Sequence, residues 1–302
     1  AKNLYASRPP DVVLAMGGFI SAPPIVAAHR RGAKTFIHES NTIPGKANRW
    51  LSRLVDGAFV YFQQTASHLR APRVLTVGMP VRPQFLQPLS AGAARAALGL
   101  DENAPVLLVM GGSQGARGVN DLVMRVLPQL LAAAPNLQFI HLTGTSDLER
   151  VRAAYAGVKA RALVQPFFSE MGTALAAADV AVSRAGASSL AELAARQTPA
   201  ILIPYPTAAD DHQHHNARAF VQSGAARALA QATATPEQLA GEIIELLRDP
   251  LKRAAMQRAL AQWHHPAAAA EIADAILHWE QQGAAAASTP AFKRPKMGAL
   301  NA

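Results

Sequence analysis

The stretch Pro105–Asn120, PVLLVMGGSQGARGVN, decides the fold of this chain. An apolar run of strand length passes through a turn with three glycines into a helical pattern, VNDLVMRVLPQLLAAA. A strand, a Gly-rich turn and a helix form one unit of a parallel α/β sheet, and the N–H groups at the helix start favour a phosphate. The turn is not a Walker motif, because it has no Gly-Lys-Ser/Thr, and it lacks the full dinucleotide spacing. Taken alone, it fits a structural role as well as a binding one.

Apolar runs alternate with helical segments on both sides of this turn, which predicts βα units. After it we expect strands at LQFIHLTG, RALVQPF, DVAVSRAG, PAILIPY and AARALA, which with PVLLVM make the six strands of a doubly wound domain. Before it we expect four, at Asp11–Gly18, Thr35–Glu39, Gly57–Phe62 and Val74–Val81. The fold class is therefore α/β, with two Rossmann-like parallel sheets of which the first is incomplete; its missing flank is expected to precede residue 1.

The domain boundaries follow from changes in this pattern. Residues 1–82 form the remainder of a first domain, and the Pro-rich segment that begins at Val81 links it to a second domain, 83–262. The pattern is wholly helical from Pro236, and residues 263–281 form a last helix. The low-complexity segment 282–302 is predicted to be a disordered tail; the alternative is an electrostatic membrane tether.

Composition excludes several classes of function. The 302 residues contain no cysteine, which rules out disulfides, thiolate metal sites and a cysteine nucleophile. The formal net charge is +9, but the charged fraction is only 16% and the basic residues are not interleaved with aromatic ones, so we expect no nucleic-acid partner. Anionic substrates or an anionic membrane surface remain as the partners that the net positive charge indicates. The longest uncharged stretch, Val12–Ala28, is too short and too rich in Gly and Pro for a transmembrane helix.

A second Gly-rich turn occurs at Ser183–Leu193, SRAGASSLAEL. Here Gly186 precedes a helix whose first turns contain Ser188, Ser189 and Glu192. Hydroxyl and N–H groups at a helix start favour a diphosphate, and a carboxylate one turn later accepts ribose hydroxyls. The alternative is a capping box between Ser189 and Glu192. Two such turns at the ends of strands in one domain indicate a sugar-nucleotide site.

The segment Asp210–Ala217, DDHQHHNA, places three histidines within four residues. His212 and His215 are three apart, His214 points elsewhere on a helix, and no third ligand is evident, so we predict no metal site. We favour a polar cluster of Asp211, His212 and Gln213 that bonds sugar hydroxyls; a solvated helix cap is the alternative.

The segment Ile37–Asn41, IHESN, ends a strand of the first domain. His38 beside Glu39 suggests a general base with an orienting carboxylate. However, neighbouring residues on a strand point to opposite faces, which favours a structural role for His38.

Together these motifs resemble one family. GGFISAP, HESNTIPGKAN, VGMPVR, GGSQGAR, SRAGASSLAEL and DDHQHHNA, in this order from about Pro10 to Trp279, resemble the bacterial N-acetylglucosaminyltransferases that form lipid II. The resemblance implies a GT-B fold, in which two Rossmann-like domains face a cleft and the last helix crosses back to the first domain. It implies transfer of GlcNAc, with inversion, from UDP-GlcNAc to the C4 hydroxyl of undecaprenyl-diphosphate-MurNAc-pentapeptide, with no metal and no cofactor.

The resemblance also implies roles for individual residues. Glu192 is expected on the ribose, the backbone of Phe168 on uracil, and Gln213 on the GlcNAc hydroxyls. The full set of expected substrate contacts is Asn41, Arg82, Ser113, Gln114, Phe168, Arg184, Ala187, Ser188, Ser189, Leu190, Ala191, Glu192, Gln213 and Asn216. His38 is the candidate catalytic residue, although the family's own base is expected in the missing N-terminus.

The family's opening GGTGGH turn, taken to bind the acceptor diphosphate and to present a histidine base, has no match in this sequence. We therefore expect weak binding of UDP or UDP-GlcNAc and little turnover. The alternatives are a related UDP-sugar transferase with another lipid acceptor and a non-catalytic UDP-sugar-binding module.

The lipid acceptor implies a peripheral location at the cytoplasmic face of the bacterial cell membrane. Lys46, Arg49, Trp50 and Arg53, at helical spacing, are expected against anionic headgroups. The alternative is a solvated helix with Trp50 in the core.

Overall fold

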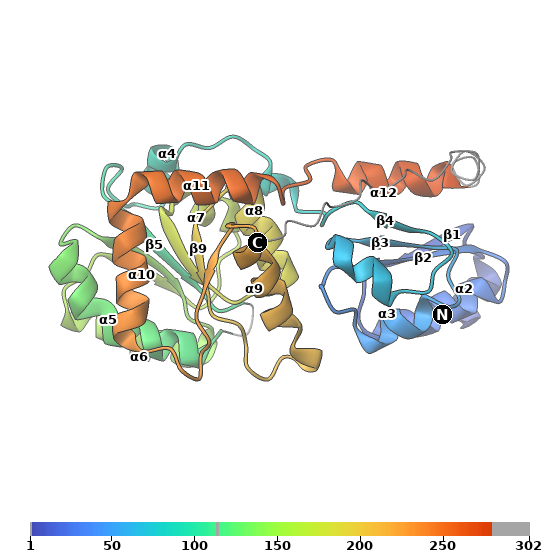
Figure 1. The fold of residues 1–302 in the computed structure, drawn as a ribbon, viewed down its shortest axis with the longest axis horizontal. Coiled ribbons are helices and arrows are strands. Elements are labelled where there is room, and N and C mark those ends of the chain that lie inside the picture. Colours follow the sequence, from blue (N-terminus) through green and yellow to red (C-terminus); the bar gives the residue numbers. More distant parts are fainter. Residues whose placement is uncertain (1, 113–114, 280–302) are drawn as a thin grey trace, which may run out of the picture.

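The chain folds into two α/β lobes, each built around its own parallel sheet (Figure 1). The computed structural model describes residues 2–112 and 115–279. The expected residues Ser113 and Gln114 and the predicted tail 282–302 lie outside this part of the chain. Within it, no helix is both long and apolar enough to cross a bilayer.

The first lobe contains a sheet of four parallel strands in the order β1-β2-β3-β4. All four strands confirm the sequence prediction: β1 Val12–Ala15, β2 Lys34–Glu39, β3 Gly57–Val60 and β4 Val74–Thr76. The helical elements of this lobe are α1 Lys2–Ser7, η1 Phe19–Ser21, α2 Ala22–His29, α3 Lys46–Leu51 and η2 Gln63–His68. Helix α2 has proline in its first turn, where the missing N–H costs nothing.

The second lobe contains a sheet of six parallel strands in the doubly wound order β10-β9-β8-β5-β6-β7. The strands are β5 Val106–Met110, β6 Gln138–Leu142, β7 Ala162–Gln165, β8 Val180–Ser183, β9 Ala200–Leu202 and β10 Arg227–Ala228. Each was predicted from its apolar run. Strands β5, β6, β8 and β9 are buried along their whole length, which is why they appear in the sequence as continuous apolar runs.

Helices cover both faces of this second sheet (Figure 1). The helical elements of this lobe and of the segments that join the lobes are η3 Pro83–Phe85, α4 Ala91–Ala97, α5 Arg117–Ala133, η4 Thr145–Asp147, α6 Leu148–Gly157, α7 Met171–Ala177, α8 Ala187–Arg196, η5 Ala209–Asp211, α9 His212–Gln222, α10 Pro236–Arg248 and α11 Pro250–Ala261. Helix α10 has a full capping box, in which Thr235 and Gln238 bond each other's backbone N–H.

The last helix, α12 Ala268–Leu277, lies against the first lobe (Figure 1) and is shorter than the helix expected over 263–281. Its residues Ile272 and Ala275 pack in one cluster with Phe36 and Phe59 of the first sheet. Just beyond the helix, Trp279 meets Phe36 edge to face, with 4.9 Å between ring centroids. The first sheet is therefore covered on this face by the end of the described chain.

Aromatic side chains join the two lobes where α11 ends. Trp263 stacks on Phe220 of α9 with 4.5 Å between centroids and also contacts Phe62 of the first lobe at 5.4 Å. Tyr61 lies beside both Phe62 and Trp263. This cluster forms an apolar contact between the lobes.

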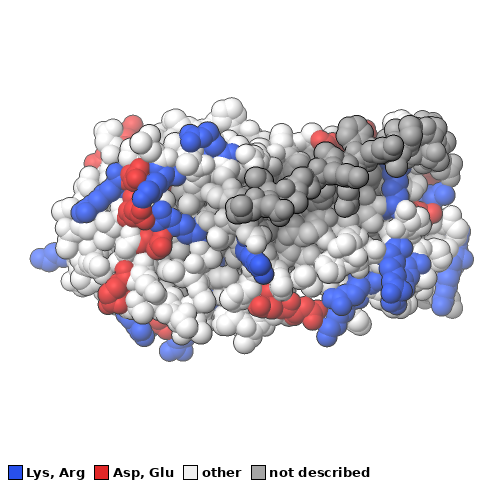
Figure 2. All heavy atoms as spheres, in the orientation of Figure 1, with Lys and Arg blue, Asp and Glu red and all other residues white. Residues whose placement is uncertain are grey.

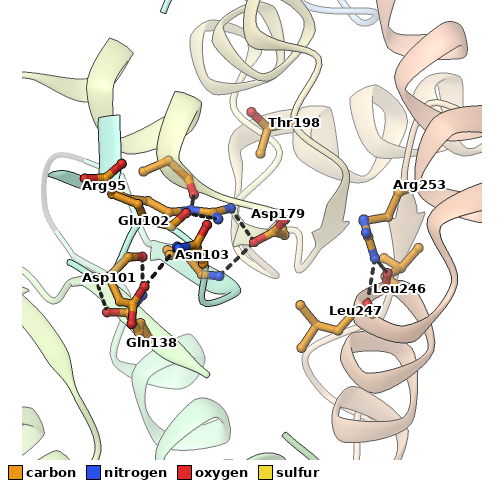
Figure 3. A network of polar contacts seen from close by, with 12 residues as sticks. Arg95, Asp101, Glu102, Asn103, Gln138, Asp179, Thr198, Leu246, Leu247 and Arg253 are labelled. Atoms are coloured by element: carbon orange, nitrogen blue, oxygen red, sulfur yellow. Dashed lines mark hydrogen bonds and ion pairs between the residues drawn. The ribbon is translucent and has the colours of Figure 1, made fainter. Parts of the chain in front are cut away.

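A polar network fastens the amino ends of the second sheet (Figure 3). The guanidinium of Arg95 donates to the carbonyls of Ala177 and Glu102 and to the carboxylate of Asp179. The same Asp179 oxygen accepts from the backbone N–H of Val106 at 2.8 Å. One buried arginine thus ties together helix α4 and the starts of β5 and β8, at the edge of the sheet opposite the cavity described below.

Replacement of Arg95 by alanine should lower the free energy of unfolding by about 2–4 kcal/mol, because it leaves a part-buried carboxylate and two carbonyls without their donor. Urea denaturation followed by circular dichroism measures this loss. Arg152→Ala, which removes an exposed pair with Glu149 and a long 3.4 Å bond to the carbonyl of Val164, should cost only about 1 kcal/mol. Equal losses of unfolding free energy in the two variants would contradict the stabilising role of Arg95.

Candidate active site

A cavity of about 340 Å³ lies at the carboxyl ends of β5 and β8. The chain runs outward from β5 through β6 and β7, and then outward on the other side from β8 through β9 and β10. The crevice between β5 and β8 is therefore the topological switch point, where open α/β sheets bind their ligands. The cavity is lined by Arg82, Met110, Gly112, Leu142, Pro166, Phe167, Met171, Ser188, Ser189 and Glu192.

The amino terminus of helix α8 forms one wall of this cavity. The helix begins at Ala187 after Gly186, and no side chain of the described residues caps that start. Ser189 lies inside the first turn, so the capping-box interpretation is wrong. The first N–H groups of α8 and the hydroxyls of Ser188 and Ser189 are thus available to an anionic group in the cavity. Ala187, Leu190 and Ala191 are buried, so their side chains serve packing.

Glu192 and Arg82 form an ion pair at the edge of the cavity, with 3.3 Å between Oε1 and a guanidinium nitrogen. Burial raises the pKa of the Glu192 carboxyl, and the charge of Arg82 acts in the opposite direction. The guanidinium also lies over the ring of Phe85, 5.2 Å from its centroid. Arg82 comes from the segment between the lobes, so this pair joins two distant parts of the chain in one site.

The two adjacent phenylalanines after β7 have different surroundings. Phe167 is 63% exposed and lines the cavity, whereas the side chain of Phe168 packs against the core of the second lobe. The expectation for Phe168 concerned its backbone and stays a prediction. Phe167 was missed because adjacent aromatic residues give no signal of which one faces outward.

Arg184 and Gln213 support the loop that follows β9. Arg184 is buried, donates to the carbonyls of Ile203 and Pro204, and lies over the ring of Tyr205; burial lowers the pKa of its guanidinium. The side-chain oxygen of Gln213 accepts from the N–H groups of Ala185 and Tyr205. The side chains of both predicted contact residues therefore form hydrogen bonds with the protein's own backbone.

Asn216 joins the two lobes through a fully used amide. Its oxygen accepts from the N–H and the hydroxyl of Thr42, and its nitrogen donates to Asn41 Oδ1 at 3.0 Å and to the carbonyl of Ala185 at 3.2 Å. The side chain is completely buried. The predicted substrate residues Asn41 and Asn216 thus meet each other, directly behind the second Gly-rich turn.

Substitution of Asn216 by alanine should lower the free energy of unfolding by about 2–3 kcal/mol, because buried donors and acceptors on both lobes lose their partner. Differential scanning calorimetry reports the change. Asn103→Ala is the matched control, since Asn103 is an exposed asparagine that bonds Asp101 through its backbone N–H. A loss no larger than that of the control would count against the interlobe role.

Glu39 organises the loop between β2 and α3. Its two carboxylate oxygens accept from the backbone N–H groups of Asn41 and Gly45 and from the amides of Asn41 and Asn48. Four donors converge on one buried carboxylate, which holds the loop beside a second cavity of about 470 Å³. That cavity lies between the lobes, since Asp210 and His212 line it together with residues of the first lobe.

His38 is only 1% exposed, and its Nε2 lies 2.9 Å from the carbonyl of Gly78, to which it donates. Burial lowers the pKa of the imidazole, and Nδ1 has no partner among the described residues. The side chain does not line either cavity. These contacts favour the structural alternative over a general base; the catalytic assignment stays an untested prediction.

A buried network beneath the first Gly-rich turn was missed from the sequence. His141 of β6 lies 3.0 Å from both the hydroxyl of Tyr155 and the amide oxygen of Asn120. Asn120, in the first turns of α5, donates to the carbonyl of Thr143 and to Asp147. Burial lowers the pKa of His141 to about 3, so the ring is neutral and bridges a donor and an acceptor. These contacts fix the start of α5 against β6.

The neutral state of His141 predicts a pH-dependent stability. Unfolding returns the pKa to about 6.5, so the unfolded state binds the proton first, and stability should fall by roughly 1 kcal/mol per pH unit as the pH drops from about 6 towards 4. His141→Gln removes this titration, and its unfolding free energy should depend less steeply on pH. Parallel curves for the two proteins would show that His141 makes no such contribution.

Metal ligands do not gather in the described residues: no group of three or more His, Cys, Asp or Glu is placed to hold an ion. In the histidine-rich segment, His214 lies 3.9 Å from Asp211, and helix α9 begins at His212. Asp211 itself has a left-handed backbone and precedes the helix.

Comparison with known proteins identifies the family of this chain. The model of the glycosyltransferase family 28 C-terminal domain matches residues 106–274, and that of the N-terminal domain matches residues 1–60. The chain belongs to glycosyltransferase family 28. The matches to this family cover the whole second sheet, including β5, β8 and helix α8 at the cavity, and strands β1 to β3 of the first sheet.

Relatives of this family 28 chain carry a specific name. A protein of Sorangium cellulosum, 42% identical over 92% of this chain and 67% of its own length, is named UDP-N-acetylglucosamine--N-acetylmuramyl-(pentapeptide) pyrophosphoryl-undecaprenol N-acetylglucosamine transferase. A Synechococcus protein of the same name is 41% identical over 90% of this chain and 72% of its own length. The crystal structure of Acinetobacter baumannii MurG matches with a TM-score of 0.72 and 28% identity, over 91% of this chain and 77% of that one. The two-domain GT-B architecture expected from the sequence is therefore confirmed.

Proposed function

We propose that this chain transfers GlcNAc, with inversion, from UDP-GlcNAc to the C4 hydroxyl of undecaprenyl-diphosphate-MurNAc-pentapeptide, which converts lipid I into lipid II. The observation that carries the proposal is the cavity at the switch point, where the uncapped start of α8, Arg82 and Glu192 converge. The names of the 38–42% identical relatives support the same reaction.

The donor would occupy this cavity with its diphosphate at the start of α8. The N–H groups of that helix and the guanidinium of Arg82 supply positive charge where the departing diphosphate becomes more negative. The carboxylate of Glu192 accepts ribose hydroxyls, and Phe167 offers an apolar surface to the base. Leaving-group stabilisation is thus supplied by the chain's own residues.

The acceptor would enter the cavity between the lobes. It is lined by the Gly17–Gly18 turn and by Lys46, which suit a diphosphate, and by the exposed apolar side chains Met16 and Phe19. Asp210 and His212 of the second lobe reach the same space. We assign His38 the task of holding the Gly78 carbonyl rather than that of the base.

Glu192→Ala should weaken UDP binding by about 1–3 kcal/mol, because the ribose hydroxyls lose a charged acceptor. Isothermal titration calorimetry with UDP measures this, with Glu149→Ala, an exposed glutamate paired with Arg152, as the control. Full UDP affinity in the Glu192 variant, or no binding by the parent chain, would overturn the donor site.

We further propose that the first lobe lies against the cytoplasmic face of the membrane. Residues 1–82 contain eleven Lys and Arg but three Asp and Glu, so this lobe carries nearly all of the net charge of +9. Figure 2 shows basic side chains along its lower and outer surface. Lys46, Arg49 and Arg53 are exposed around Trp50, which is 48% exposed rather than in the core.

The Trp50→Ala, Arg53→Ala variant should co-sediment less with vesicles that contain anionic lipid, because it loses an interfacial ring and a charge worth about 1 kcal/mol near the surface. The matched control is Leu251→Ala, Arg258→Ala, which removes an exposed apolar residue and an exposed arginine from the second lobe. Equal binding by the two double variants would exclude this surface.

A further inference from the structure

One arginine of the second lobe bonds the backbone of the segment that leaves the first lobe. Arg196, in the last turn of α8, donates to the carbonyl of Gln84 at 2.6 Å and to that of Gln87 at 2.7 Å. A single guanidinium thus bridges two main-chain carbonyls of the segment that follows Arg82. Planar donors in a fixed fork fit such a pair better than a single ammonium.

Other contacts show that this segment is closely fitted to the second lobe. Phe85 is 1% exposed and belongs to the core of that lobe, and the amide of Gln84 donates to the carbonyl of Ser169. A Cβ added to Gly172 of α7 would lie 2.8 Å from the Gln84 carbonyl oxygen and 3.2 Å from the Arg196 guanidinium. The segment therefore has little room to shift while Arg196 is in place.

Arg82 depends on this fit. It immediately precedes η3, its guanidinium lies over Phe85, and its side chain is still 56% exposed, so few contacts fix it over the cavity. Glu192, its ion-pair partner, and Arg196 are four residues apart on α8. One helix therefore holds the segment at two points: Glu192 meets the side chain of Arg82, and Arg196 meets the backbone that follows it.

We propose that Arg196 is a positioning residue of the donor site, which acts through Arg82: by fixing the carbonyls of Gln84 and Gln87 it holds the Arg82 guanidinium at the cavity, ready for the diphosphate. The inference rests on the proposed function, because it takes the cavity as the site of UDP. Its distinctive consequence is that Arg196 matters for UDP only while Arg82 is present.

The test is a double-mutant cycle with UDP titrated calorimetrically into the parent chain, Arg82→Ala, Arg196→Ala and the double variant. We expect Arg82→Ala to raise the Kd by about tenfold and Arg196→Ala by about threefold to tenfold. In the double variant we expect the Kd of Arg82→Ala alone. An Arg196 effect of the same size in both backgrounds, or none in the parent background, would overturn the inference.

Two further variants separate positioning from stability. Arg253 also donates to two carbonyls, those of Leu246 and Leu247, but lies on α11 (Figure 3), so Arg253→Ala should leave the Kd for UDP unchanged. Arg196→Lys keeps one donor nitrogen in place of the guanidinium fork, so its Kd should lie between those of the parent chain and Arg196→Ala. It also allows the test if the alanine variant does not fold. Failure of both Arg196 variants to fold would make the role structural and refute the proposal; failure of the parent to bind UDP would refute the proposed function instead.

Discussion

The pairing of β5 with β8 is the constraint on which the site depends. These strands are far apart in the sequence, yet Met110 and Ser183 lie in register at their carboxyl ends. Each strand runs directly into a Gly-rich turn and a helix, so the pairing brings the two turns to one edge of the sheet. The fixed direction of parallel strands also keeps the Arg95 network at the opposite edge, where it stabilises the sheet and leaves the cavity edge free.

The two lobes are joined by both apolar and polar contacts, and the polar ones lie nearest the site. Aromatic stacking around Trp263 supplies an interface with little directional preference, whereas the amide of Asn216 accepts only one arrangement of its partners. Because Ala185 belongs to the second turn, the same amide sets the distance between that turn and the loop held by Glu39. The contacts that orient the lobes are thus also the ones that shape the cleft.

The sequence predicts the sheets well because strands buried on both faces leave continuous apolar runs, of which Val106–Met110 is an example. It predicts the second turn less completely, since SSLAEL fits a capping box as well as an uncapped helix start. Only the position of the first helical residue, Ala187, distinguishes the two. The bonds of Asn216 to Thr42 and of His141 to Tyr155 and Asn120 leave no local pattern, because their partners are set by tertiary packing. The exposure of Phe167 rather than Phe168 likewise depends on the backbone after β7.

The return of α12 to the first sheet has a consequence for biosynthesis. During translation, Phe36 and Phe59 leave the ribosome early, but Ile272 and Trp279, which cover them, emerge more than two hundred residues later. The nascent first sheet must therefore wait, with one face bare, until almost the entire second lobe has been made. Chaperones that bind exposed apolar surface would bind this face of the first sheet. The two lobes would then complete their folding together rather than in the order of their synthesis.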